Sequence, residues 1–89
     1  MDKTWPQLLL IDDDPVAARL LRAVFAPESI GVSAAQTAAD GLEQLAQVEP
    51  QVVVLDLWLP DMGGLEVLEK LRAQRPQLPV IMLTGQVDV

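Results

Sequence analysis

The sequence predicts an α/β fold, a doubly wound parallel sheet whose strands are connected by single helices. Three observations predict it: short apolar runs that end in polar residues, helical apolar periodicity between these runs, and glycine or proline at the boundaries. Runs that are apolar on both faces are typical of strands buried between two layers of helices. Strands that alternate with helices predict right-handed crossovers and one parallel sheet.

Four strands are predicted, at residues 8–11, 31–36, 52–55 and 80–83. Three of them are short, wholly apolar runs, and two of these three end at aspartates. The segment 31–36 is more polar and alternates only weakly, so we expect it at an edge of the sheet.

Two helices are predicted between the first three strands. The first begins at Asp14, whose carboxylate is placed to cap it, with Pro15 in the first turn, and Pro27 ends it. The second opens at Thr37, in a sequence that resembles a capping box, and closes before Pro50. Helical spacing predicts inward faces made of Val16, Leu20, Leu21 and Val24 in the first helix and of Ala38, Leu42, Leu45 and Ala46 in the second.

A third helix is predicted between the third and fourth strands. Gly64 leads into it and Pro76 stops it. Its inward face is expected to consist of Leu65, Leu68 and Leu71, which follow helical spacing.

Length and composition limit the class of protein. The chain has 89 residues, which is enough for one domain at most, and 51% of them are hydrophobic. Apolar runs such as 52–55 are far too short to span a membrane, so we expect a soluble domain. The first residues lack the charged-then-apolar pattern of an export signal, and we therefore expect a cytoplasmic protein.

Charge and the missing residue types exclude several functions. The formal net charge is −7, with 13 acidic and 6 scattered basic residues, which argues against direct binding of nucleic acid. The chain has no histidine or cysteine, so disulfides, thiol nucleophiles, the usual zinc sites and histidine-based catalysis are excluded. Carboxylate and hydroxyl chemistry remains.

Acidic residues follow two strands that are expected to be neighbours. In an open parallel sheet, ligands bind outside the carboxyl ends of the strands, where the strand order reverses. In the order 2-1-3-4 this point lies between the first strand, which ends in Asp12, Asp13 and Asp14, and the third, which ends in Asp56. Carboxylates that converge there repel one another and need a counter-ion. A few oxygen ligands with room for water and phosphate favour Mg²⁺.

Three separated motifs resemble a known family. They are Leu-Leu-Leu-Ile-Asp-Asp-Asp-Pro at 8–15, Asp-Leu-Trp-Leu-Pro-Asp-Met-Gly-Gly-Leu at 56–65 and Val-Ile-Met-Leu-Thr-Gly at 80–85. In this order they resemble the receiver domain of bacterial two-component response regulators, over essentially the whole chain. The resemblance implies a flavodoxin-like topology and a phosphoryl-accepting signalling domain, not a turnover enzyme, with a sensor histidine kinase as its partner.

The resemblance also implies individual roles. Asp56 is the phospho-acceptor, Asp12 and Asp13 bind Mg²⁺ together with it, the backbone carbonyl of Trp58 completes the metal shell, and Thr84 is the switch hydroxyl. These roles agree with the chemistry of the residues, because a carboxylate can attack phosphorus when a metal neutralises the charge on the phosphoryl oxygens.

The chain departs from the family pattern after its fourth strand. Receivers continue through a fourth helix, a fifth strand with a phosphate-binding lysine and a switch aromatic, and a fifth helix. We therefore expect residues 1–89 to form a receiver domain that is incomplete at its C-terminus, either part of a longer regulator or a naturally shortened form. The apolar strand 80–83 would then be an unpaired edge, so we expect a homo-oligomer or a segment-swapped dimer.

Three alternatives stay open. The first is a receiver-like interaction module that has lost phosphotransfer and self-associates through its fourth strand. The second is a hydrolase of the haloacid dehalogenase type, which requires a second aspartate where Trp58 stands. The third is a flavin-binding protein of similar topology, in which the three acids after the first strand would repel a flavin phosphate.

Overall fold

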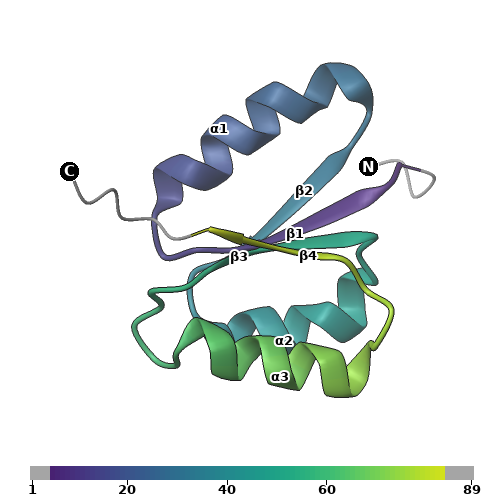
Figure 1. The fold of residues 1–89 in the computed structure, drawn as a ribbon. Helices are drawn as coiled ribbons and strands as arrows, with labels where there is room; N and C mark the ends of the chain where they lie inside the picture. The colour runs from purple at the N-terminus through teal and green to yellow at the C-terminus, as the bar shows by residue number, and fades with distance from the viewer. Residues whose placement is uncertain (1–4, 84–89) are drawn as a thin grey trace.

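The computed structural model describes residues 5–83, which form a four-stranded parallel sheet with helices on both faces (Figure 1). The strand order is β2-β1-β3-β4. This confirms the predicted fold class, the predicted order and the edge position of the more polar strand. The elements are β1 (Gln7–Ile11), α1 (Pro15–Phe25), a 3₁₀ turn (Ala26–Glu28), β2 (Gly31–Ala35), α2 (Ala38–Val48), β3 (Val52–Asp56), α3 (Gly64–Gln74) and β4 (Val80–Leu83).

The first two helices begin at the residues predicted to cap them. The carboxylate of Asp14 accepts a hydrogen bond from the backbone N–H of Val16 at 2.9 Å. The hydroxyl of Thr37 accepts one from the N–H of Asp40 at 3.1 Å. Each cap satisfies an N–H group that has no partner inside its helix, so it fixes where the chain turns from strand end to helix.

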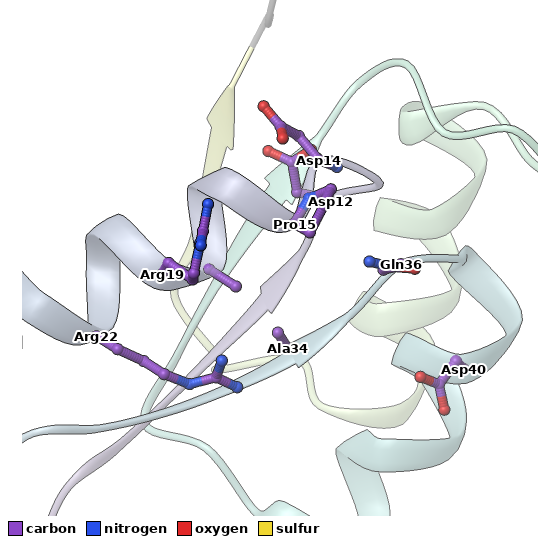
Figure 2. A pocket seen from close by; sticks show the side chains of 9 residues that line it. Asp12, Asp14, Pro15, Arg19, Arg22, Ala34, Gln36 and Asp40 are labelled. Atoms are coloured by element: carbon purple, nitrogen blue, oxygen red, sulfur yellow. The ribbon is translucent and has the colours of Figure 1, made fainter.

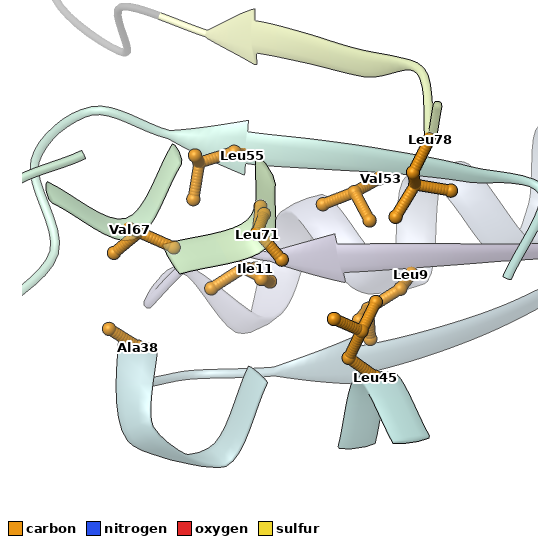
Figure 3. Close-up of a cluster of buried hydrophobic side chains, with 9 residues drawn as sticks. All are labelled: Leu9, Ile11, Ala38, Leu45, Val53, Leu55, Val67, Leu71 and Leu78. Carbon is orange, nitrogen blue, oxygen red and sulfur yellow. The ribbon is translucent and has the colours of Figure 1, made fainter. Parts of the chain in front are cut away.

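One face of the sheet packs against α2 and α3 (Figures 1 and 3). Alternate residues of β1 and β3 point to this face because side chains alternate along a strand. The buried cluster between sheet and helices consists of Leu9, Ile11, Ala38, Leu45, Val53, Leu55, Val67, Leu71 and Leu78.

The inward faces of α2 and α3 differ from the prediction at two positions. Ala46 is exposed, and so is Leu65, at 69%, whereas Val67 is fully buried. The start of α3 sets this rotation: a Cβ added at Gly64 would lie 2.6 Å from the Cα of Leu57. Gly64 therefore faces the interior, and the next residue of the helix, Leu65, points outward.

Among residues 5–83, α1 is the one helix on the other face of the sheet (Figure 1). Leu8, Leu10, Ala18 and Val54 are buried there, with Leu21 and Phe25 among the partly buried residues packed against them. The prediction was wrong for the three residues Val16, Leu20 and Val24, which are 44%, 61% and 61% exposed.

The physical reason for this difference is that α1 lies against β2, so that within the described residues no helix covers the part of this face toward β4. The apolar side of α1 borders a hollow of about 400 Å³, which we call the α1–β4 groove. It is lined by Leu8, Leu10, Ala17, Leu20, Leu21, Phe25, Val54, Ile81 and Leu83.

Strand β4 forms the other edge of the sheet. It pairs with β3, and among residues 5–83 no strand pairs with its outer side. Val80 and Met82 pack against the buried cluster, whereas Ile81 is 53% exposed and faces the α1–β4 groove. Within the same residues, no helix is both long and apolar enough to cross a membrane.

Candidate functional site

The acidic residues that follow β1 and β3 meet at the carboxyl edge of the sheet. The register of these parallel strands pairs Ile11 with Leu55, and the next residues are Asp12 and Asp56. Asp12, Asp13 and Asp56 each place one carboxylate oxygen so that all three lie within 4.8 Å of one another. The structure therefore brings together the three carboxylates that the sequence predicted to converge.

Asp56 is the least accessible member of this cluster. Its side chain is 6% exposed, and it is the only polar or charged side chain that is buried among residues 5–83. Its Oδ1 accepts a hydrogen bond from the backbone N–H of Trp58 at 3.0 Å. This bond fixes the carboxylate relative to the loop that leaves β3. The Trp58 side chain itself is 62% exposed.

Asp12 is the half-buried member of the cluster. Burial, together with the charges of Asp56, Asp13 and Asp14, raises the pKa of Asp12 above its usual value, although a hydrogen bond from the backbone N–H of Asp14 opposes this shift. A raised pKa means that the surroundings disfavour the carboxylate form. A cation among the carboxylates would remove this penalty.

The donor set fits Mg²⁺. The three ligand atoms are carboxylate oxygens, the type that hard divalent cations prefer. An octahedral Mg²⁺ with ligands at about 2.1 Å holds neighbouring oxygens about 3 Å apart and opposite ones about 4.2 Å apart. The observed spread of up to 4.8 Å is only slightly wider, so small side-chain rotations would bring the oxygens into range.

Trp58 and Thr84 were also expected at the site. The backbone of Trp58 lies beside the cluster, because its N–H donates to Asp56. Thr84, the expected switch residue, lies outside the described residues. Asp14 borders the cluster but caps α1, as predicted.

The loop between β3 and α3 is held at both its base and its tip. Trp58 and Gly63 form an antiparallel bridge, and the N–H of Gly64 donates to the carbonyl of Leu57 at 3.1 Å. At the tip, Asp61 accepts two hydrogen bonds from the first turn of α2. No role was predicted for Asp61 from the sequence. The available signal was that Asp61 is an acidic residue in the motif that begins at Asp56.

A polar pocket of about 620 Å³ lies beside the cluster, between α1 and the start of α2 (Figure 2). Arg19 and Arg22 line its α1 side and Asp40 its α2 side. Asp12 borders this pocket but Asp56 does not, so the pocket adjoins the acid cluster and is separate from it.

This fold and this acid cluster define a signalling module, and the chain belongs to the response regulator receiver domain family. The family's sequence model matches residues 8–89. Response regulators of two-component systems are thus the class of protein to which it is related.

Individual relatives agree with this assignment. The chain is 39% identical over 79 residues to the probable transcriptional regulatory protein TcrX of Mycobacterium tuberculosis, covering 89% of this chain and 34% of TcrX. It is 32% identical over 81 residues to the regulatory protein LuxO of Vibrio cholerae, covering 89% of this chain and 18% of LuxO. The chain thus spans about a third of the first relative and less than a fifth of the second.

Solved structures share the fold. A CheY-like response regulator receiver domain protein from Methanospirillum hungatei superposes with a TM-score of 0.87 at 31% identity, over 97% of this chain and 69% of that one. The non-phosphorylated HemR receiver domain of Leptospira biflexa gives a TM-score of 0.83 at 28% identity, over 94% of this chain and 68% of the other.

Proposed function

We propose that the chain is a phosphoryl-accepting signalling domain of a two-component phosphorelay, with Asp56 as the acceptor. The observation that carries this proposal is the position of Asp56: it is buried at the end of β3, oriented by the Trp58 N–H, and within 4.8 Å of two further carboxylates. Receiver domains interact with sensor histidine kinases, and such a kinase is the partner we propose.

The proposed chemistry is transfer to a carboxylate. An oxygen of Asp56 attacks phosphorus and forms the new P–O bond of an acyl phosphate. The bond from phosphorus to the donor breaks, and the donor group leaves with the electron pair and takes up a proton. The hydrogen bond from Trp58 to Oδ1 supports this role because it restricts the direction in which the carboxylate points.

We propose that Asp12, Asp13, Asp56 and the backbone carbonyl of Trp58 hold Mg²⁺. When bound, the ion neutralises negative charge that develops on the phosphoryl oxygens. The raised pKa of Asp12 supports the site, because burial and the neighbouring carboxylates make its uncompensated charge unfavourable.

Thr84 is proposed as the hydroxyl that binds the phosphoryl group. The support comes from the residue before it: Leu83 is the register partner of Asp56, and its carbonyl accepts the N–H of Leu57 at 2.9 Å. The chain therefore leaves β4 at the level of the acid cluster.

Site mapping tests the proposed acceptor. The chain is incubated with Mg²⁺ and a small acyl phosphate donor, the product is reduced with borohydride, and the modified residue is located by mass spectrometry. We expect modification at Asp56 and none in Asp56→Asn. Asp40→Asn is the matched control, because it alters an exposed carboxylate on α2, and it should leave the yield of modified Asp56 unchanged. Modification at Asp61 in the unaltered chain would contradict the proposal.

Self-association is a second candidate function, favoured by the α1–β4 groove. All the side chains that line the groove are apolar, and the neighbouring face of α1 exposes Val16, Leu20 and Val24. We propose a second copy of the chain as the occupant, because one chain supplies both the apolar groove and the apolar helix face that could fill it. Two copies related by a two-fold axis could then each insert α1 into the other.

Charge restricts where two copies of the chain could meet. The chain carries a net charge of −7, so two copies repel each other over most of their surfaces. The groove and the exposed apolar face of α1 contain no charged residue. Within residues 5–83 no strand pairs with the outer edge of β4 beside the groove, and a second copy could also engage the backbone groups there.

A further inference from the structure

Asp61 connects two segments that are distant in the sequence. It lies at the tip of the β3–α3 loop, and its carboxylate oxygens accept the backbone N–H groups of Ala38 at 2.8 Å and of Ala39 at 3.0 Å. These donors belong to the first turn of α2, more than 20 residues earlier in the chain. The loop that follows Asp56 is thus attached directly to another helix.

The attachment shares the capping of α2 between two residues. The first N–H groups of a helix have no partner within it. Thr37 accepts the N–H of Asp40, whereas Asp61 accepts the two that precede it. The two residues therefore cap the same helix end, but only Asp61 belongs to the loop beside the acid cluster.

The electrostatics favour the bound form of Asp61. The N-terminus of a helix carries partial positive charge, which stabilises a carboxylate. The hydrogen bonds from Ala38 and then Ala39 lower the pKa of Asp61 below its ordinary value of 3.8. At neutral pH the contact is therefore charge-assisted.

We call the two hydrogen bonds from α2 to Asp61 the clamp. A short loop, closed at its base, connects the clamp to the acid cluster. Trp58 and Gly63 bridge across the loop, so the segment between them is fixed at its base. Asp61 fixes its tip. Trp58 belongs to this closed segment, and its N–H donates to Asp56. A change at the tip is thus three residues away from the peptide that orients the acceptor carboxylate.

We propose that Asp61 is a positioning residue for the acid cluster: by clamping the β3–α3 loop onto α2, it holds the Trp58 backbone in place beside Asp56. This inference rests on the proposed function for the role of the Trp58 carbonyl in binding Mg²⁺. The side-chain hydrogen bonds of Asp61 go to α2, and Asp61 is not a member of the acid cluster. The competing explanation is that Asp61 only stabilises α2.

Paired variants separate these explanations. Asp61→Ala removes both hydrogen bonds of the clamp, and Thr37→Ala removes a cap from the same end of α2 without touching the loop. Asp61→Asn keeps a carbonyl acceptor and is expected to rescue part of the effect. It is also the second variant if Asp61→Ala does not fold. All variants are made with Trp5→Phe, so that Trp58 is the only fluorophore of its kind.

The measurements are the Mg²⁺ dissociation constant from Trp58 fluorescence and the phosphorylation rate of Asp56. We expect Asp61→Ala to weaken Mg²⁺ binding by about 10-fold or more, the usual effect of losing a group that orients a metal ligand. Asp61→Asn should fall between Asp61→Ala and the parent chain. Thr37→Ala should change the constant less than about twofold at a temperature where all variants are folded. Equal effects of Asp61→Ala and Thr37→Ala would overturn the inference.

Amide hydrogen exchange at Trp58 tests the clamp independently of Mg²⁺. We expect Asp61→Ala to accelerate this exchange and Thr37→Ala to leave it unchanged. If the parent chain binds no Mg²⁺ and is not labelled at Asp56, the proposed function fails, while the exchange result still decides whether Asp61 holds Trp58. Unchanged exchange at Trp58 in Asp61→Ala would reject the positioning role.

Discussion

Ile11 and Leu55 are register partners in neighbouring parallel strands, and this pairing places Asp12 and Asp56 side by side at the edge of the sheet. A shift of one residue would move each side chain of the strand to the opposite face. The buried packing of Ile11 and Leu55 therefore secures the geometry of the acid cluster.

Mg²⁺ removal should destabilise the parent chain much more than the Asp12→Asn variant. In the parent chain, Mg²⁺ at ten times its dissociation constant should stabilise the fold by about 1.4 kcal/mol, and EDTA should abolish this gain. Asp12→Asn should have a higher melting temperature than the parent chain in EDTA, because it removes a charge that burial and neighbouring carboxylates disfavour. It should gain much less from Mg²⁺. Thermal unfolding with and without Mg²⁺ measures both effects, and equal Mg²⁺ stabilisation of the two proteins would exclude Asp12 as a ligand.

The clamp of Asp61 should depend on pH. Its folded pKa lies below 3.8, so the stabilisation is present above 3.8 and is lost as the pH falls through the folded pKa. The pKa of Asp12 is raised, so Asp12 contributes a pH dependence of stability with the opposite sign. Both the parent chain and Asp61→Asn contain Asp12, so its contribution cancels in the difference between their stabilities. Urea unfolding from about pH 6 to about pH 2.5 should show a stability difference that shrinks only below about pH 4. A difference that stays constant over this range would show that the charge of Asp61 contributes nothing.

Gly64 should tolerate no side chain, whereas its neighbour should. A Cβ at Gly64 would lie 2.6 Å from the Leu57 Cα, a backbone atom that cannot move away without distorting the loop. We expect Gly64→Ala to lower the free energy of unfolding by about 1–3 kcal/mol. Gly63→Ala is the matched control, because Gly63 has a φ of −65° and nothing within 4 Å of an added Cβ. Chemical denaturation measures both, and equal stabilities of the two variants would refute the close contact.

Self-association should depend on the α1–β4 groove. Ile81→Lys places a charge in the groove and should weaken association by about tenfold or more, since burying such a side chain contributes about 1.5–3 kcal/mol. Leu65→Lys is the control, because Leu65 is 69% exposed on α3, on the other face of the sheet. Sedimentation over a wide concentration range measures the dissociation constants. A parent chain that stays monomeric throughout, or equal effects of both variants, would contradict the proposed dimer.

The sequence predicted the strands and the acid cluster because local signals determine both. Strands are marked by apolar runs, and a polar residue at the end of each run marks the edge at which parallel strands converge. The caps Asp14 and Thr37 were likewise local, since each side chain bonds within three residues of its own position.

The errors arose where a distant contact decides the outcome. Helical spacing located the apolar side of α1, from which burial was predicted. The position of α1 over β2 instead leaves Leu20 and Val24 exposed. The rotation of α3 follows from the contact between Gly64 and Leu57. The role of Asp61 depends on its contact with α2, more than 20 residues away, which no periodicity in the sequence encodes.

The most direct test of the proposed function is the intact mass of the chain after incubation with a small acyl phosphate donor. With Mg²⁺ we expect the addition of a single phosphoryl group to the parent chain and none to Asp56→Asn. Without Mg²⁺ the addition to the parent chain should be at least about tenfold slower, because the charge on the phosphoryl oxygens is then not neutralised. Uptake of a phosphoryl group by Asp56→Asn at the rate of the parent chain would contradict the central claim.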